Sequence, residues 1–307
     1  MRINLGVNLS FAITRYVEPE EWTKIVSQKL ELKYIQFFSD LLDPFFTPPS
    51  IRSEICQKIK NLNKKHNLEM HSVFSGTIPH CLNLLLHPDE RMRRAALKWY
   101  EGGIEMTSEM ECPGYGGFLG AFSKRDVQDE RKKKVLLNEL IDHWGYLSRL
   151  AKKRGIKFLL FEPMSCIREF PSTISETKWL YQKLSESSEL PVYLCLDVGH
   201  GRARSGNERD ANPYAWLREF APKNPVIHLQ QTDRMTSRHW PFIEEFNRRG
   251  KIEAKKLIRT LKGGGTKETF FFLEIMYPPF EPFDDLVLDD LKESVNYWRK
   301  ALRESEI

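Results

Sequence analysis

Short apolar runs alternate with longer amphipathic segments along this chain of 307 residues. Buried parallel strands are continuous apolar runs, whereas helices repeat their apolar positions every three to four residues. Runs typical of strands occupy residues 3–8, 32–38, 68–74, 113–119, 157–161, 192–196, 225–229 and 269–273. Helical patterns begin near residue 19 and cover 49–66, 88–110, 129–153, 172–185, 213–220, 253–261 and 284–303. Strands and helices are therefore expected to alternate along the whole chain.

This alternation predicts an α/β fold, a (β/α)8 TIM barrel. The strands follow one another at intervals of roughly 30 to 45 residues, the size of a β-α-β repeat, and eight such units favour a closed barrel. No proline- or serine-rich linker interrupts the pattern, so a single domain is expected over residues 1–307. A doubly wound sheet, the competing arrangement, would carry a glycine-rich turn after the first strand, and Gly6-Val7-Asn8 is not one.

Polar side chains stand at the ends of the last four predicted strands. Asp197 follows the run 192–196 in Leu194-Cys195-Leu196-Asp197-Val198-Gly199-His200; the equivalent residues of the other three strands are Glu162, His228 and Glu274. The C-terminal ends of barrel strands meet on one rim, where α/β barrels build their sites. A single acidic residue there is most often a helix cap or an ion-pair partner. Three clustered carboxylates, however, would repel one another without a cation. We therefore expect these four residues to bind one divalent metal ion, and the oxygen-rich set favours Mn²⁺, with Mg²⁺ or Co²⁺ as alternatives, over structural Zn²⁺.

Composition limits the remaining possibilities. Apolar residues make up 41% of the chain, enough for a large core, and the net charge of +5 is spread along the predicted helices. This distribution favours an anionic small molecule over nucleic acid. The five cysteines are odd in number and contain no CxxC pair, which indicates reduced thiols in a cytoplasmic protein. The N-terminus MRINLGVNLSF lacks the pattern of a signal peptide, and no apolar stretch is long enough to cross a membrane.

Several motifs resemble those of one family. FEP at Glu162, LDVGH at Asp197, IHLQQTD at His228 and LEIMYPP at Glu274 are similar to the sugar isomerase/epimerase superfamily of xylose-isomerase-like barrels. With MHSVFSG, GGFLG and HWPF, the chain most resembles the tetrulose-phosphate 3-epimerases of erythritol and threitol catabolism, the D-erythrulose 1-phosphate 3-epimerase type. The resemblance extends from GVNLSF to LEIMYPP, which is nearly the whole chain.

The resemblance implies a reaction and roles for the metal-binding residues. Such enzymes invert a carbon beside a carbonyl, and a divalent metal acts as a Lewis acid that stabilises the enediolate. One carboxylate removes a proton and another returns it on the opposite face. By position, Glu162 and Glu274 match these two bases as well as being ligands, whereas Asp197 and His228 match ligands only. Family members commonly form dimers, so the resemblance also implies a homodimer.

Further residues are candidates for substrate binding. His200 matches a substrate contact in the epimerases and a further metal ligand in the DNA-repair branch of the fold. Glu169 is close to the position of a glutamate that hydrogen-bonds substrate, or is a surface acid. Arg234 matches a substrate-binding arginine and suits a phosphate. We also expect His71, at the end of the third strand, to line the pocket, and His239 to lie on a loop over the site.

The glycine-rich run at Gly116 and Gly117 presents two alternatives. Its backbone amides suit a phosphate, but glycines of this kind also allow close backbone packing.

Three other functions would each require a different set of residues. An apurinic-site endonuclease needs several metal ions, but no acid or histidine follows the fourth strand. An aldose–ketose isomerase of the classical xylose type uses a lysine near its metals, and none flanks Glu162 or Asp197; a keto-inositol enzyme would share the barrel. A non-catalytic sugar-binding barrel would be expected to lose a ligand, whereas all four are present. We therefore favour a metal-dependent ketose 3-epimerase acting on a tetrulose phosphate or a similar small ketose phosphate, with an isomerase or keto-inositol enzyme acting on an unphosphorylated sugar as the alternative.

Overall fold

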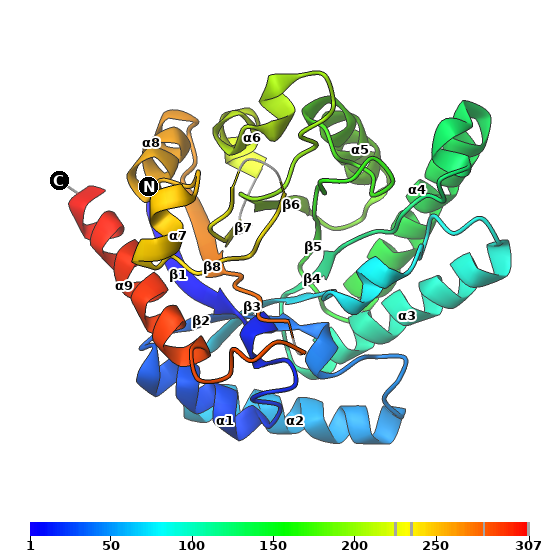
Figure 1. Ribbon diagram of the computed structural model, residues 1–307. Helices are drawn as coiled ribbons and strands as arrows, with labels where there is room; N and C mark the ends of the chain where they lie inside the picture. The colour runs from blue at the N-terminus through cyan, green and yellow to red at the C-terminus, as the bar shows by residue number, and fades with distance from the viewer. Residues whose placement is uncertain (224–225, 234–235, 279, 306–307) are drawn as a thin grey trace.

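Parallel strands close into a barrel at the centre of the molecule, in the order β1 to β8 (Figure 1). The computed structural model describes residues 1–223, 226–233, 236–278 and 280–305. The strands are β1 (Arg2–Asn8), β2 (Tyr34–Phe38), β3 (Glu69–Phe74), β4 (Gly114–Gly117), β5 (Phe158–Phe161), β6 (Val192–Asp197), β7 (Val226–Leu229) and β8 (Glu268–Leu273). The predicted (β/α)8 TIM barrel is confirmed, and each strand lies within a few residues of its expected position.

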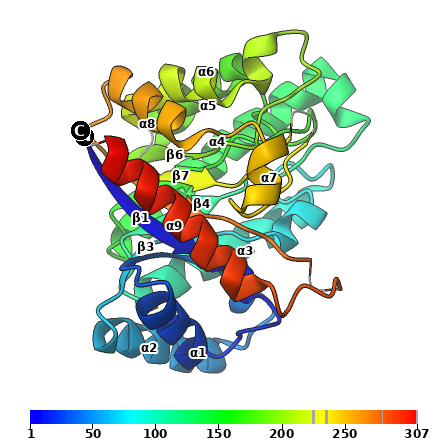
Figure 2. The same ribbon diagram turned by 60° about the vertical axis from the view of Figure 1, so that its left-hand side comes forward.

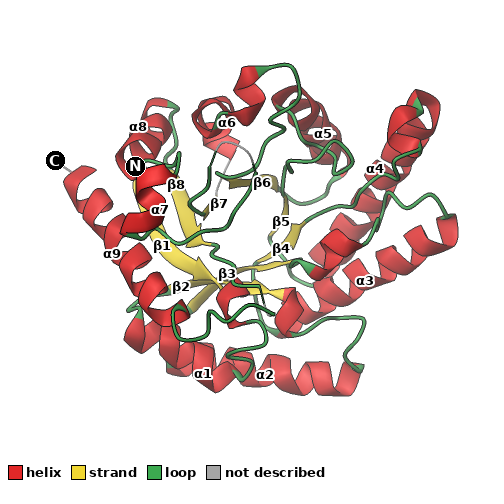
Figure 3. Cartoon of the chain, viewed as in Figure 1, coloured by secondary structure: helices red, strands yellow, loops and turns green. Residues whose placement is uncertain are grey.

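Helices form a ring outside the strands (Figure 3). They are α1 (Pro19–Lys24), α2 (Pro49–Lys65), α3 (Glu90–Glu109), α4 (Glu130–Lys153), α5 (Ile174–Ser187), α6 (Pro213–Phe220), α7 (Glu244–Arg249), α8 (Ala254–Gly263) and α9 (Val287–Ser305). The short helix α7, which the sequence pattern did not predict, lies between β7 and α8. Among the described residues, no helix is both long and apolar enough to span a bilayer.

The hydrophobic core fills the space between the barrel and its helices. In the turned view, α9 runs in front of β1 (Figure 2). Its fully buried Trp298 packs edge-on against Phe271 of β8, with ring centroids 5.4 Å apart, and against Phe242, at 5.1 Å. Large aromatic side chains of this kind bury much apolar surface, and this packing holds the last helix against the last strand and the segment before α7.

The glycine-rich strand β4 is used for close packing. A Cβ atom on Gly116 would lie 1.8 Å from the carbonyl oxygen of Leu160, and one on Gly117 would lie 2.3 Å from Ser75 Oγ. The same Ser75 hydroxyl accepts a hydrogen bond from the backbone N–H of Phe118 (2.9 Å). Of the two alternatives for this run, the structure supports close backbone packing.

We expect Gly116→Ala to lower the free energy of unfolding by at least about 2 kcal/mol, because the new methyl group must displace the β5 backbone. Urea denaturation of the purified variant measures this. Gly263→Ala is the matched control, since nothing lies within 4 Å of that Cβ position, and it should change stability by less than about 0.5 kcal/mol. Equal stability of the two variants would contradict the packing role.

Candidate metal centre and its surroundings

Four polar side chains converge at the C-terminal ends of β5 to β8. Glu162 directly follows β5 and Glu274 directly follows β8, while Asp197 ends β6 and His228 lies within β7. Backbone hydrogen bonds continue the strand pairing to both glutamates, from Glu162 N to Gly117 O (3.1 Å) and from Glu274 N to Leu229 O (3.0 Å). One ligand atom from each of the four residues lies within 4.8 Å of the others, and all four residues are buried. The structure therefore brings the predicted set together.

The spacing of these atoms fits a divalent cation. His228 Nδ1 lies 3.2 Å from Glu162 Oε1 and 3.0 Å from Glu274 Oε2. Neighbouring ligands of an octahedral ion with bonds of roughly 2.1 Å are separated by about 3 Å. Among the described residues, neither His228 Nδ1 nor Glu162 Oε1 has a hydrogen-bond partner, although both atoms are buried. Buried polar atoms without partners are costly, and a bound cation would satisfy both.

Burial and neighbouring charges shift the pKa values of the residues in this site. Burial opposes ionisation of Asp197, but the nearby His200, His239 and His228 hold its pKa at about 2. Burial raises the pKa of Glu274 above its ordinary value, although His228 opposes the rise. Burial would lower the pKa of His228, yet the facing Cys195 and Glu274 raise it well above its ordinary value. Clusters of carboxylates and imidazoles with such perturbed values are typical of functional sites.

A chain of hydrogen bonds from β1 and β2 fixes the orientation of the His228 ring. The backbone N–H of Ser10 donates to Asn8 Oδ1 (2.8 Å), so the amide nitrogen of Asn8 must point the other way, where it donates to Gln36 Oε1 (2.7 Å). Gln36 Oε1 is thereby an acceptor, and it lies 2.6 Å from His228 Nε2. His228 must then carry a proton on Nε2, so in the neutral ring the Nδ1 lone pair faces the two glutamates.

Asp197 is held from a different direction. The side-chain nitrogen of Gln230, which follows β7, donates to both carboxylate oxygens at 2.8 and 2.9 Å. The backbone N–H of Gly199 donates to Asp197 Oδ1 as well (2.5 Å). Together these donors fix the carboxylate and favour its charged form.

Two further histidines lie at the edge of the four-residue cluster. His200 Nδ1 donates to the Pro163 carbonyl (3.1 Å) and lies 3.6 Å from Glu162 Oε1. His239 Nδ1 donates to the Glu274 carbonyl (3.1 Å). Ligand atoms of Asp197, His200 and His239 also lie within 4.8 Å of one another. The structure places both histidines beside the cluster, and their substrate-binding or metal-binding roles stay predictions.

Of the other predicted substrate-binding residues, Glu169 is described and its role stays a prediction, whereas Arg234 is not described. Glu169 is on the loop after β5, where its carboxylate faces His80 Nδ1 at 3.7 Å. Arg234 lies outside the described residues.

The expectation that His71 lines the pocket is wrong. His71 is the extra residue of an irregularity in β3, because Ile35 pairs with Met70 and Gln36 with Ser72. Its ring packs against Phe270 at 4.3 Å and Phe158 at 5.1 Å, and burial lowers its pKa to about 3. Phe74, three residues further along β3, is the side chain that reaches His228.

Sequence reasoning missed Asn8, Gln36 and Gln230, the side chains that orient the cluster. All three are completely buried. Asn8 and Gln230 follow apolar runs, which is the same signal that revealed the acidic residues, whereas Gln36 lies inside one. Amides are common at strand ends for many structural reasons, so that signal alone does not distinguish them.

Comparison with known proteins agrees with this geometry. Residues 26–301 match the family model of the xylose isomerase-like TIM barrel. The chain is 27% identical over 299 residues to D-erythrulose 1-phosphate 3-epimerase of Brucella abortus (strain 2308), covering 97% of this chain and 96% of the relative.

Solved structures show the same fold. A candidate xylose isomerase from Rhodospirillum rubrum superposes with a TM-score of 0.88 and is 30% identical, covering 97% of this chain and 99% of that one. A D-psicose 3-epimerase from Clostridium cellulolyticum, 12% identical, shares the fold with a TM-score of 0.68 over 97% of this chain and 99% of its own. The chain described here therefore belongs to the xylose isomerase-like TIM barrel family.

Proposed function

We propose that this protein is a divalent-metal-dependent ketose 3-epimerase that acts on a tetrulose phosphate or a similar small ketose phosphate. The observation that carries the proposal is the pair of buried glutamates, Glu162 and Glu274, which face the same nitrogen of His228 from two sides. The similarity to D-erythrulose 1-phosphate 3-epimerase supports the choice of substrate class.

Glu162, Asp197, His228 and Glu274 would hold the cation. A divalent ion bound there supplies Lewis-acid stabilisation to the carbonyl and hydroxyl oxygens of a ketose; Mn²⁺ is the ion we expect. The chain's own contribution is orientation: Gln36 keeps the proton of His228 on Nε2, and Gln230 holds both oxygens of Asp197. Partners of this kind fix the tautomer and the ring position of a metal-binding histidine.

Glu162 and Glu274 are the proposed bases for the proton at C3. Their side chains are only 3% and 2% exposed, so both carboxylates lie inside the site and not on the protein surface. Removal of the C3 proton by one carboxylate, and its return by the other on the opposite face, inverts the carbon. His200 and His239, at the edge of the site, are the proposed contacts for substrate hydroxyl groups. The homodimer stays a prediction.

We expect Glu162→Gln and Glu274→Gln each to lower the rate of C3 inversion by at least about 100-fold, because each removes one of two required bases. NMR in D₂O with the two C3 isomers of erythrulose 1-phosphate measures both inversion and deuterium uptake. Each variant should still exchange the C3 proton of the isomer whose proton faces its remaining glutamate.

Manganese binding, measured on the same variants, separates loss of a base from loss of the ion. Full inversion by either variant, or exchange of the same isomer by both, would show that the two-base assignment is wrong.

A second expectation concerns the ring of His228. Gln36→Leu removes the acceptor for its Nε2–H and should weaken Mn²⁺ binding by about 10- to 100-fold, as measured by calorimetry. Gln57→Leu is the control, because Gln57 lies on the exposed face of α2 and hydrogen-bonds only to Glu109 O within the described structure. Unchanged affinity in the Gln36 variant would mean that the ring is oriented by other contacts.

A further inference from the structure

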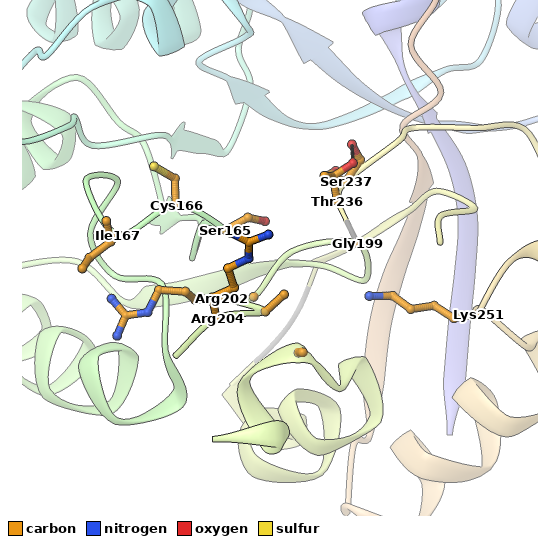
Figure 4. A pocket seen from close by; sticks show the side chains of 12 residues that line it. Ser165, Cys166, Ile167, Gly199, Arg202, Arg204, Thr236, Ser237 and Lys251 are labelled. Atoms are coloured by element: carbon orange, nitrogen blue, oxygen red, sulfur yellow. Dashed lines mark hydrogen bonds between the residues drawn. The ribbon is translucent and has the colours of Figure 1, made fainter. Parts of the chain in front are cut away.

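A cavity of about 660 Å³ opens beside the candidate metal centre (Figure 4). Its walls come from the loops that follow β5, β6 and β7, and include Ser165, Arg202, Arg204, Ser237 and Lys251. Figure 4 shows Lys251 extending into the space from the side opposite the two arginines. The loops that follow three of the four strand ends of the candidate metal centre therefore also form a chamber lined by cationic and hydroxyl side chains.

Hydrogen bonds connect this cavity directly to Asp197. Gly199 lines the cavity and donates its backbone N–H to Asp197 Oδ1. Gln230 Nε2 donates both to Asp197 and to the hydroxyl of Ser237, at 2.7 Å for the latter. A group bound in the cavity thus lies next to the ligands of the candidate metal centre, separated from Asp197 by a single layer of side chains.

The charge of the cavity is unbalanced. Among the described residues that line it, three carry a positive charge and none is acidic. The ion pair between Arg202 Nη1 and Glu176 Oε1 is the one described carboxylate contact of either arginine, and it is long, at 3.7 Å. The other oxygen of Glu176 is already occupied, because it accepts hydrogen bonds from the backbone of Ser172 and Thr173. Most of the positive charge of the two arginines is therefore available to an anion.

Two buried polar atoms at the cavity have no partner within the described part of the chain: Arg202 Nε and Ser165 Oγ. Buried donors left without partners cost free energy, and each such case calls for an explanation. The loop that carries Arg202 is nevertheless fixed, since Gly201 N donates to Met164 O (3.3 Å) and Arg202 N to Ser172 O (3.0 Å). The arginine is thus anchored by its backbone, while its side chain keeps free donors.

We propose that this cavity binds the phosphate group of the substrate, with Arg202 and Arg204 as its main cations and Ser165 as a neutral donor. Guanidinium groups match the oxygens of a phosphate in geometry and charge. In a ketose 1-phosphate, only the C1 methylene and the ester oxygen separate phosphorus from the carbonyl carbon, which suits a phosphate site adjoining Asp197. This inference rests on the proposed function for the identity of the substrate, but the binding site itself can be tested separately.

The test uses dihydroxyacetone phosphate, which has a C1 phosphate and a C2 carbonyl but no stereocentre at C3, and dihydroxyacetone as the uncharged counterpart. Calorimetry on the Mn²⁺-loaded protein should show that Arg202→Gln combined with Arg204→Gln weakens binding of the phosphate by about 10- to 100-fold and leaves dihydroxyacetone unaffected. Ser165→Ala should weaken binding of dihydroxyacetone phosphate by about 2- to 10-fold. If the double variant does not fold, the Ser165 variant alone tests the phosphate site.

Arg209→Gln is the matched control, since it removes the same charge from the same loop. Arg209 does not line the cavity and pairs with Glu219 at 3.0 Å. Its replacement should therefore leave the affinity for dihydroxyacetone phosphate unchanged. The phosphate site is wrong if wild-type protein does not bind dihydroxyacetone phosphate, or if the double and Ser165 variants bind it as wild type does. If binding depends on the arginines but no ketose phosphate is epimerised, the site stands and the proposed function fails.

Discussion

The site buries three carboxylates beside one imidazole, and the arrangement of the surrounding side chains depends on stabilising them. Like charges this close oppose one another's ionisation, so the fold must supply donors and, by our proposal, a cation. Three of the strands supply such donors and acceptors: Asn8 of β1 and Gln36 of β2 orient His228, while Gln230 beyond β7 stabilises the charged form of Asp197 by hydrogen bonding. The barrel brings together groups that are far apart in the sequence, because parallel strands end on one side.

This geometry explains which parts of the site were visible in the sequence. Glu162, Asp197 and Glu274 each stand where an apolar run stops, and His228 lies one residue before the end of its run. The alternating pattern correctly predicted that these runs are neighbouring parallel strands. Once the barrel is predicted, convergence of the four residues follows from strand direction alone. The fold and the metal-binding candidates were therefore predictable with no knowledge of side-chain contacts.

Other features depend on details that periodicity does not encode. The pairing of β2 with β3 shifts by one residue between Ile35 and Gln36. A bulge of this kind changes which face a side chain occupies, and for this reason His71 joins the barrel interior instead of the pocket. The cavity with Arg202 and Arg204 was missed for a different reason: both arginines lie on an irregular loop, where neither strand nor helix spacing indicates the direction of a side chain. Gly116 illustrates another case, since the sequence left phosphate binding and close backbone packing both open for the glycine-rich run, and the contacts of Gly116 support the packing.

The proposed cation is the central element, because the proposed two-base chemistry depends on it. A Mn²⁺ titration of the purified protein, followed by electron paramagnetic resonance, tests it most directly. We predict that one ion binds per chain and that His228→Ala, which removes the Nδ1 lone pair, abolishes this binding. Wild-type protein that takes up no manganese, or a His228→Ala variant that binds it equally well, would contradict the metal centre.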